Sequence, residues 1–377
     1  MTHSDTKEKR TMDPVVTVTE NDPITQAARQ LEAGHLVAFP TETVYGLGAD
    51  AENVAALAQI FAVKGRPSNH PVIVHLPVGA PLSYWAKDIP AEAYRLVEAF
   101  WPGPLTLILQ RASHIPSAVS GGQASIGLRC PAHPVAQALL NTFKGGKGGI
   151  AAPSANKFGH VSPTMAKHVH DEFAAEIAAG RIASVLDGAQ SEVGIESSIL
   201  DLTRLASHGP VLLRPGHISA DAISAVLGCS VSNVAPSANK PSEEAANAPR
   251  VSGSLDAHYA PNTPVVQIDT DKLRDLLMRV LASGRKVALM HITEECLQLN
   301  TAQSCENVLL QRAMPRDANS YAHDLYASLR ELDSAEMDLI VVESLPKTAD
   351  WQGVNDRLAR ASFDSRHLLS EWLDKSS

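Results

Sequence analysis

The chain has 377 residues, a formal net charge of −9, 44% hydrophobic residues and 19% charged residues. This composition is typical of a folded globular protein rather than a disordered or membrane-embedded one. The excess of acidic residues argues against a protein that binds nucleic acid over a broad surface, because neutralising phosphates requires a surplus of Lys and Arg. A chain of this length exceeds what one hydrophobic core normally supports, so we expect two domains.

Residues 1–21 are polar and lack the apolar core of a signal peptide, and no later run approaches the roughly 20 apolar residues of a membrane span. We therefore expect a disordered N-terminal tail, a cytoplasmic location and no membrane association. The cysteines form no C-x-x-C pair, which predicts reduced, mostly buried thiols. They are Cys130, Cys229, Cys296 and Cys305. The histidines show no metal-binding spacing, so no metal site in the protein is expected.

Residues 22–228 alternate short apolar runs with stretches of helical periodicity, which predicts a first domain built on a mixed α/β sheet. The expected strands cover residues 35–40, 71–77, 104–110, 125–129, 149–153, 183–188, 197–202 and 210–214. The expected helices cover residues 53–63, 90–100 and 134–143. Ser162 followed by Pro163 resembles an N-cap with Pro at the first helical position, which predicts a helix from there to about residue 173.

Residues 229–264 are rich in Ser, Ala, Asn and Pro and have no periodicity, which indicates a linker. An α/β pattern then resumes over residues 265–377. Strands are expected at 265–269, 285–292 and 338–345, helices at 271–284, 320–332 and 351–362, and a further apolar segment at 307–314. Strands separated by helices predict a small parallel, Rossmann-like sheet. No G-x-G-x-x-G sequence is present, so dinucleotide binding is not predicted there.

The hexapeptide APSANK occurs twice, at residues 152–157 and 235–240. The first copy ends an apolar run and precedes the expected helix, in the kind of strand-end turn that commonly presents ligand groups in open α/β sheets. The second copy lies inside the linker, where composition alone explains it unless the linker folds back over a pocket. We expect the first copy to belong to a binding site.

Basic residues stand at the ends of several expected elements, namely Lys64, Arg66, Arg129 and Arg214. Lys64 and Arg66 have an alternative explanation, because cations also complement the dipole at a helix C-terminus. Four cations at converging element ends nevertheless favour a site for a polyanion. The chain lacks a G-x-S-x-G elbow and a Walker A lysine, so we expect chemistry by positioning and charge neutralisation rather than by a covalent nucleophile.

Hydroxyl, amide and glycine residues accompany these cations. Thr41, Thr43, Gly46 and Gly48 follow the first expected strand, where the glycines would let the backbone approach a ligand closely. Ser154 and Asn156 lie in the first APSANK copy, and Glu196, Ser197 and Ser198 precede another strand. A pocket of this composition suits a substrate that carries phosphates and a carboxylate.

Seven segments in fixed order carry a family resemblance: PTETVYGLG, KGRP…HPVIVH, WPGPLTLIL, IGLRCP, APSAN, GIESSILD and LLRPG. Together they resemble the YrdC-type threonylcarbamoyl-AMP synthases, and the HYAP sequence in the linker with the small α/β tail resembles the long two-domain form. The specific motifs cover roughly residues 22–264. The resemblance implies a YrdC-like twisted open sheet with a positively charged cavity, and a linker that folds over the active site.

The resemblance also implies a reaction, in which L-threonine, bicarbonate and ATP give L-threonylcarbamoyladenylate and pyrophosphate for the threonylcarbamoyladenosine modification of tRNA. Magnesium is expected to accompany ATP, with no tightly bound cofactor. The product is expected to pass to a downstream threonylcarbamoyl transferase complex, and contact with tRNA is possible but not required. A closing linker would exclude water, in which carbamates decompose.

The resemblance also implies roles for individual residues, at the positions of this sequence that match the family's motifs. The positions matching nucleotide contacts are Lys64, Arg66, His70, Ser154, Asn156, Arg214 and Tyr259, of which Tyr259 would close over the nucleotide. The positions associated with threonine are Thr43, His75, Arg129 and Ser198. Ser198 stands where many members have Thr, and His70 stands where Asn is common. We expect Lys64 and Arg66 to be catalytic by stabilising charge on the leaving group.

Two other functions compete with this interpretation. A non-catalytic module that binds double-stranded RNA or tRNA would need excess positive charge and exposed aromatic residues, whereas this chain is acidic and 5% aromatic. A hydrogenase-maturation carbamoyltransferase would add cysteine-rich zinc motifs and an acylphosphatase-like segment, which this sequence lacks.

The role of residues 265–377 stays open between two alternatives. Their polar and aromatic helix residues either pack and solvate the helices, or let this domain position the linker, control access or contact the transferase. The residues concerned are Tyr321, His323, Asp324, Tyr326, Asn355 and Arg357.

Overall fold

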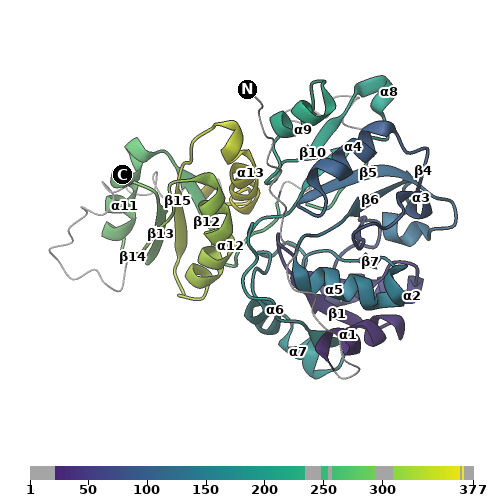
Figure 1. Ribbon diagram of the computed structural model, residues 1–377. Coiled ribbons are helices and arrows are strands. Elements are labelled where there is room, and N and C mark those ends of the chain that lie inside the picture. The colour runs from purple at the N-terminus through teal and green to yellow at the C-terminus, as the bar shows by residue number, and fades with distance from the viewer. Residues whose placement is uncertain (1–21, 234–247, 254–256, 294–308, 366, 369–377) are drawn as a thin grey trace, which may run out of the picture.

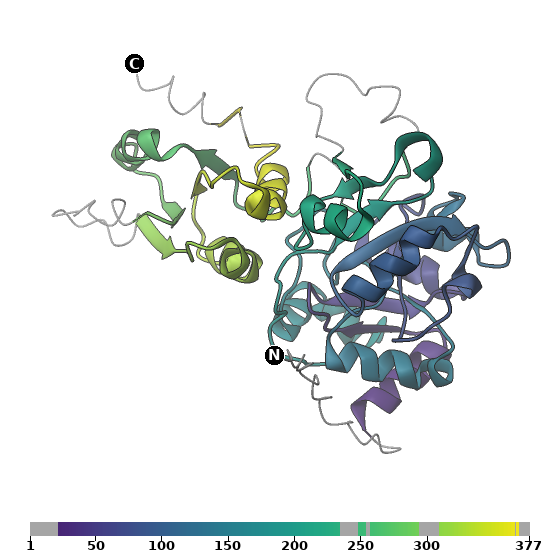
Figure 2. The ribbon, with the colours of Figure 1, turned by 45° about the horizontal axis from the view of Figure 1, so that its top comes forward.

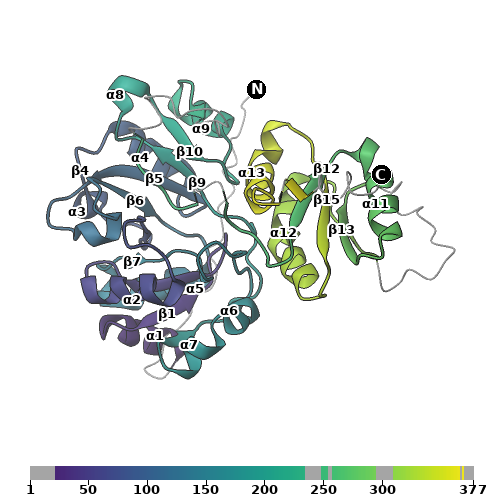
Figure 3. The same cartoon turned by 180° about the vertical axis from the view of Figure 1, so that it is seen from behind.

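The computed structural model describes residues 22–233, 248–253, 257–293, 309–365 and 367–368. It contains two α/β units, each with its own sheet. Helices α12 (Ala318–Asp333) and α13 (Gln352–Ala361) of the second unit lie on the side that faces the first unit (Figures 1 and 2). Figure 3 shows the same contact from behind. The expected tail over 1–21 and the second APSANK copy lie outside the described residues.

Within the described residues, eleven strands form the large sheet, in the order β11-β10-β9-β5-β6-β3-β7-β2-β1-β8, with β4 paired to β5. The strands are β1 (Leu36–Phe39), β2 (Gly46–Asp50), β3 (Ile73–His75), β4 (Ala86–Lys87), β5 (Leu105–Arg111), β6 (Ser125–Arg129), β7 (Ile150–Ala151), β8 (Ile182–Val185), β9 (Ser198–Asp201), β10 (Val211–Arg214) and β11 (Ser232–Asn233). Parallel pairs such as β5/β9 and antiparallel pairs such as β5/β6 occur together. The predicted mixed sheet is therefore confirmed.

Helices cover this sheet and connect its strands. They are α1 (Pro23–Glu32), α2 (Val54–Lys64), α3 (Leu82–Trp85), α4 (Ala91–Phe100), α5 (Pro134–Thr142), α6 (Ala166–Glu172), α7 (Ala174–Ala178), α8 (Leu205–His208) and α9 (Ala220–Leu227), with 3₁₀ turns η1 (Ser117–Ser120) and η2 (Phe143–Gly146). Asn53 caps α2 by accepting from the N–H groups of Ala55 and Ala56, and Gly65 ends it with a φ of 63°. This C-terminus directs Lys64 into the protein, where it is 3% exposed.

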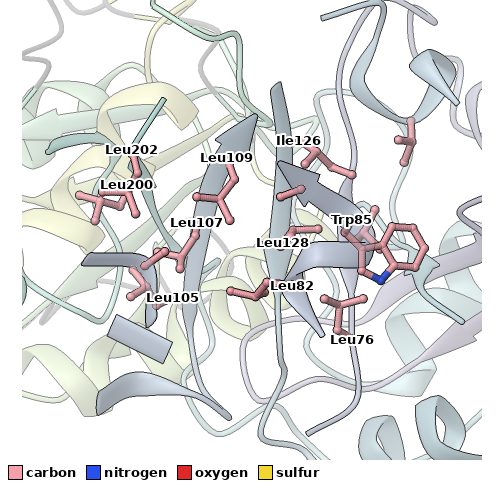
Figure 4. Close-up of a cluster of buried hydrophobic side chains, with 14 of the residues drawn as sticks. Leu76, Leu82, Trp85, Leu105, Leu107, Leu109, Ile126, Leu128, Leu200 and Leu202 are labelled. Carbon is pink, nitrogen blue, oxygen red and sulfur yellow. The ribbon is translucent and has the colours of Figure 1, made fainter. Parts of the chain in front are cut away.

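The two faces of the β5 region have different roles because side chains alternate along a strand. On one face, Leu105, Leu107 and Leu109 join a large buried cluster with residues of the neighbouring strands and helices (Figure 4). On the other face, Thr106 donates to or accepts from the hydroxyl of Ser197 at 2.8 Å, and Ile108 packs with Val251 of the linker. The core therefore supports one side of the strand and leaves the opposite side for polar residues and the linker.

Two predictions about local structure were wrong. Residues 46–50, where no strand was predicted, form the buried strand β2, and a Cβ on Gly48 would come within 2.8 Å of the Ile150 side chain. Gly48 is thus required for packing between strands. Ser162 is not an N-cap, because α6 begins at Ala166 and the Ser162 hydroxyl instead donates to Glu196 at 2.6 Å.

The second unit has a four-stranded sheet in the order β12-β15-β13-β14, and all its pairs are parallel, as predicted. The strands are β12 (Val265–Ile268), β13 (Val287–His291), β14 (Leu309–Ala313) and β15 (Leu339–Glu343), with α11 (Thr270–Ala282) and the 3₁₀ turn η4 (Ala349–Trp351). Strand β15 is buried along its whole length, as parallel central strands usually are. None of the described helices combines the length and apolar character that a membrane crossing requires.

The leucine face of β5 should control the stability of the large sheet. Replacing Leu107, which is fully buried, with Ala removes apolar contacts and leaves a cavity, so we expect unfolding free energy to fall by about 2–5 kcal/mol. Replacing Val78, which is 59% exposed, with Ala should cost about 0.5 kcal/mol or less. Chemical denaturation followed by tryptophan fluorescence compares the two. Equal losses of unfolding free energy in the two variants would show that the leucine face of β5 does not stabilise the core.

Candidate functional site

A cavity of about 490 Å³, counting its open mouth, lies on the polar side of the large sheet. Its walls come from the segment after β1, from β3 and β6, from the first APSANK copy, from the β9 and β10 ends and from the linker. Predicted site residues on the wall are Thr43, His75, Arg129, Ser154, Arg214 and Tyr259. The structure therefore brings together side chains from distant strand ends.

Three further predicted residues lie directly against this wall. The Lys64 ammonium donates to the carbonyl of Ser154 at 2.6 Å and to that of Asn156. Arg66 donates to the carbonyl of Pro71 at 2.8 Å and reaches the hydroxyl of Ser252 at 3.3 Å. Lys64, Arg66 and Asn156 are 6% exposed or less. The first APSANK copy is thus held by a buried lysine.

Arg214 extends this basic region along the cavity wall. Its guanidinium donates to the carbonyl of Ser197 at 2.9 Å and to the carbonyl of Ser252 at 2.9 Å. Arg66 and Arg214 therefore both contact Ser252 of the linker. Because Lys64, Arg66 and Arg214 are held mainly by neutral oxygens, most of their positive charge is left to attract an anion.

A second basic group lies at the other predicted part of the site. Arg129 forms a 2.7 Å ion pair with Glu42, whose other carboxylate oxygen accepts from the N–H of Ala132 at 3.0 Å. The Arg129 Nε and the His75 Nδ1 are buried and have no partner within the structure. Thr43 lies beside them on the wall, its hydroxyl 2.9 Å from that of Thr41. Unpartnered buried polar atoms facing a cavity are suited to a ligand.

The linker forms one wall of the cavity through Ser252, His258 and Tyr259. It is fastened by Gln123, whose side chain accepts from the N–H of Arg250 at 2.7 Å and donates to the carbonyl of that residue at 3.1 Å. Gly253 has a φ of 77°, and a Cβ there would lie 2.0 Å from the Tyr259 hydroxyl. Linker residues therefore form part of the cavity wall, and only glycine fits beside the tyrosine.

Not every predicted residue faces the cavity. The Ser198 hydroxyl donates to the carbonyl of Ile218 at 2.6 Å, whereas its neighbour Ser197 lines the cavity. Ser197 directly precedes β9, and successive side chains of an extended segment point to opposite faces, which explains the difference. His70 is half-buried and packs edge-to-face on Phe158, with ring centroids 5.4 Å apart, beside the cavity rather than on its lining.

Sequence reasoning did not settle the role of the second unit, and the structure connects two of its candidate residues to the site. Tyr326 donates to the Glu196 carboxylate at 3.0 Å and Arg357 forms a 2.7 Å ion pair with it. By contrast, His323 pairs with its neighbour Asp324, and Asn355 donates to the carbonyl of Pro346. The helices thus pack their own unit and also hold a wall residue of the cavity.

Burial and neighbouring charges shift the pKa values of the cavity groups. Burial, reinforced by Arg66, lowers the pKa of Lys64 well below its usual value. Burial and then Arg129 lower the pKa of His75 to about 3, so this imidazole is neutral near pH 7. Burial alone would raise the pKa of Glu196, but Arg357 and Arg214 outweigh it and bring the value to about 2.

The free thiols differ in exposure, since Cys130 is buried and Cys229 is exposed. Among the residues that the structure describes, no three His, Cys, Asp or Glu side chains are grouped to hold a metal ion.

The low pKa of His75 predicts a pH-dependent stability. The unfolded chain takes up a proton on this residue near pH 6.5, whereas the folded chain does so only near pH 3, so stability falls as pH drops below 6.5. His75→Gln should reduce this slope by up to about 1.4 kcal/mol per pH unit between roughly pH 4.5 and 6.5. Denaturation at several pH values measures it.

The same titration contains its own control, because His75 is neutral in both states between about pH 7.5 and 8.5. The variant and the original chain should have equal slopes there. If the variant and the original chain have the same slope of unfolding free energy against pH in the acid range, His75 takes up protons in the folded protein as well.

Known proteins match both units of the chain. Residues 29–216 match the protein family described as "Telomere recombination", and residues 218–362 match the family described as "Threonylcarbamoyl-AMP synthase, C-terminal domain". A threonylcarbamoyl-AMP synthase of Pyrococcus abyssi is 35% identical over 89% of this chain and 93% of its own length. One of Bacillus subtilis is 36% identical over 91% of this chain and 94% of its own length.

Solved structures agree with these sequence matches. Pyrococcus abyssi Sua5 complexed with L-threonine has a TM-score of 0.77 and 34% identity, and covers 90% of this chain and 94% of its own. A double alanine variant of the same protein also has a TM-score of 0.77, at 33% identity. These matches favour an enzyme over an RNA-binding module without catalytic activity. The chain belongs to the threonylcarbamoyl-AMP synthase family, in its long two-domain form.

Proposed function

We propose that the cavity binds ATP and L-threonine side by side and joins them, through bicarbonate, into L-threonylcarbamoyladenylate with release of pyrophosphate. The observation that carries this proposal is the gathering of Lys64, Arg66, Arg129 and Arg214, all 6% exposed or less, at one cavity. Three of these cations are held mainly by neutral oxygens, which suits a polyphosphate. The fourth is paired but keeps an unpartnered Nε, which suits a carboxylate.

The chemistry consists of two balanced steps. The threonine ammonium group first loses a proton to the solvent. The amine then attacks carbon dioxide and releases a second proton to the solvent, or attacks bicarbonate with loss of water, and gives a carbamate. A carbamate oxygen then attacks the α-phosphorus of ATP, the bond from that phosphorus to the bridging oxygen breaks, and pyrophosphate leaves. The protein supplies position and positive charge rather than a nucleophile.

The contacts support a division of roles within the cavity. Lys64 fixes the backbone of Ser154 and Asn156 and brings positive charge to the phosphates, while Arg66 and Arg214 exchange their hydrogen bonds with Ser252 for bonds to phosphate oxygens. At the other end, Arg129 binds the threonine carboxylate, held in place by Glu42. Neutral His75 offers its ring nitrogen to the amino acid. Tyr259 and His258 close the wall and limit the entry of water.

Magnesium is proposed to arrive with ATP as part of the substrate. Glu196 contributes a carboxylate to the wall, and its oxygens already accept from Arg357, Tyr326 and Ser162. The cavity therefore offers hydroxyls and cations rather than free carboxylates, a donor set that does not suit a resident magnesium site. Transfer of the product to a threonylcarbamoyl transferase, any contact with tRNA and a cytoplasmic location remain predictions.

The reaction itself is tested by pyrophosphate release from ATP. Release should require both L-threonine and bicarbonate, and the product should have the mass of threonylcarbamoyladenylate. Release that is independent of threonine would rule out this function.

Lys64 should matter for turnover rather than for folding. Lys64→Met keeps the stem but removes the charge and both backbone contacts, and should lower kcat by roughly 100-fold. Lys157→Met is the matched control, because Lys157 belongs to the same APSANK copy and its side chain is exposed. The control should stay within about twofold of the original rate. A Lys64→Met variant that is folded and fully active would remove this lysine from the mechanism.

Arg129 should determine threonine binding. Arg129→Lys keeps the charge beside Glu42 but loses the planar guanidinium, so the KM for threonine should rise by about tenfold or more. The KM for ATP should change much less. Steady-state kinetics with each substrate varied separates the two constants. Equal rises in both would contradict a specific threonine contact.

A further inference from the structure

A buried polar network joins the second unit to the cavity wall, and we call it the Glu196 network. It consists of Glu196, Arg357, Tyr326 and Ser162. The Glu196 carboxylate accepts from Arg357 Nε at 2.7 Å, from Tyr326 at 3.0 Å and from Ser162 at 2.6 Å. Arg357 also donates to the carbonyls of Glu196 and Pro215, at 3.1 and 2.8 Å. Arg357 and Tyr326 are 1% exposed or less.

Arg357 touches the linker as well as the large sheet. Its guanidinium carbon lies 5.4 Å from the centroid of the Tyr259 ring, within cation–π range, and the Tyr326 ring lies 5.9 Å from the same ring. Tyr259 has a left-handed φ of 62°, which a residue with a Cβ adopts only where its surroundings hold it there. Arg357 thus contacts two residues of the cavity wall without lining the cavity itself.

The Glu196 network affects the charge of the cavity wall as well as the packing. Glu196 is a carboxylate on the wall of a cavity proposed to receive a polyphosphate. An unpaired carboxylate in such a buried place would repel that ligand and is costly to desolvate. Arg357 neutralises it from the second unit, and Asp356, which also accepts from Arg357 at 2.7 Å, is in turn paired with Arg360 at 3.0 Å.

We infer that Arg357 is a positioning residue for the reaction, which acts through Glu196 and Tyr259. It keeps the Glu196 carboxylate engaged away from the polyphosphate and holds the Tyr259 ring against the cavity. The inference rests on the proposed function, because it assigns to the second unit a part in ATP binding at that same site. It differs from a general role of the second unit in stability, since it predicts an effect on one substrate.

A second interdomain contact supplies the matched control. Arg330 of α12 forms a 3.1 Å ion pair with Glu172 and donates to the carbonyl of Val161, so it joins the same two units. Neither Arg330 nor Glu172 lines the cavity. Replacing Arg330 should therefore weaken the contact between units, while the Glu172 carboxylate stays bound by His160 and by the N–H of Lys157.

The test compares Arg357→Met with Arg330→Met in the full chain, by pyrophosphate release with ATP or threonine varied and by thermal melting. Arg357→Met should raise the KM for ATP by at least tenfold and change the KM for threonine by less than threefold. Arg330→Met should change both constants by less than twofold, even where melting temperatures fall equally. Equal kinetic effects of the two variants, or an unchanged KM for ATP in Arg357→Met, would overturn the inference.

Two further variants separate charge from packing. Adding Glu196→Gln to Arg357→Met removes the unpaired carboxylate. The KM for ATP of the double variant should be at least fivefold lower than that of Arg357→Met. Arg357→Lys keeps a positive charge and should stay within about threefold of the original KM. If Arg357→Met does not fold, Tyr326→Phe replaces it, since it removes one donor to Glu196, and should raise the KM for ATP by about threefold. Absence of recovery in the double variant, or an unchanged KM in Tyr326→Phe, would overturn the charge argument.

Turnover by the unmodified chain keeps the two hypotheses distinguishable. If it releases no pyrophosphate with threonine, bicarbonate and ATP, the proposed function fails, and the inference that rests on it falls too. If it is active and Arg357→Met behaves as Arg330→Met does, only the inference fails.

Discussion

Burial of positive charge is the constraint on which the architecture of the site depends. Lys64, Arg66 and Arg214 are almost completely buried, and a buried cation needs acceptors close to it. Here the acceptors are mainly carbonyls and the Ser252 hydroxyl rather than carboxylates. Neutral acceptors satisfy the hydrogen bonds of these cations without cancelling their positive charge. An acidic chain with a net charge of −9 therefore still contains a basic cavity. The overall charge therefore says little about the potential inside this cavity.

Arg129 follows a different rule, and the difference divides the cavity into two chemical regions. Its ion pair with Glu42 neutralises most of its charge while fixing the direction of its guanidinium. A guanidinium that is fixed in direction and already paired with a carboxylate suits a single carboxylate of the substrate. The charges of Lys64, Arg66 and Arg214 are less compensated, which suits several phosphate oxygens. The Glu196 network repeats the principle of local neutralisation at another part of the wall, with Arg357 as the compensating residue.

Much of this arrangement could be predicted from the sequence, and the exceptions have physical causes. Apolar runs located every predicted strand of the large sheet, because burial of both faces leaves a strong signal. Strand β2 was missed because Gly46 and Gly48 are typical of turns, yet close packing against Phe39 and Ile150 requires glycine at position 48. Ser197 and Ser198 could not be told apart, since only the register of β9 decides which faces the cavity.

The ion pair between Glu196 and Arg357 had no sequence signal, because its partners are 161 residues apart and come from different units. This separation has a consequence for biosynthesis. Strand β1 at residues 36–39 pairs with β8 at residues 182–185, and β10 pairs with β11 at residues 232–233, so the large sheet cannot be complete until about residue 233 has been made. The wall at Glu196 is completed still later, by Arg357. A ribosome-bound nascent chain therefore carries an unfinished catalytic chamber until nearly all of it has been translated.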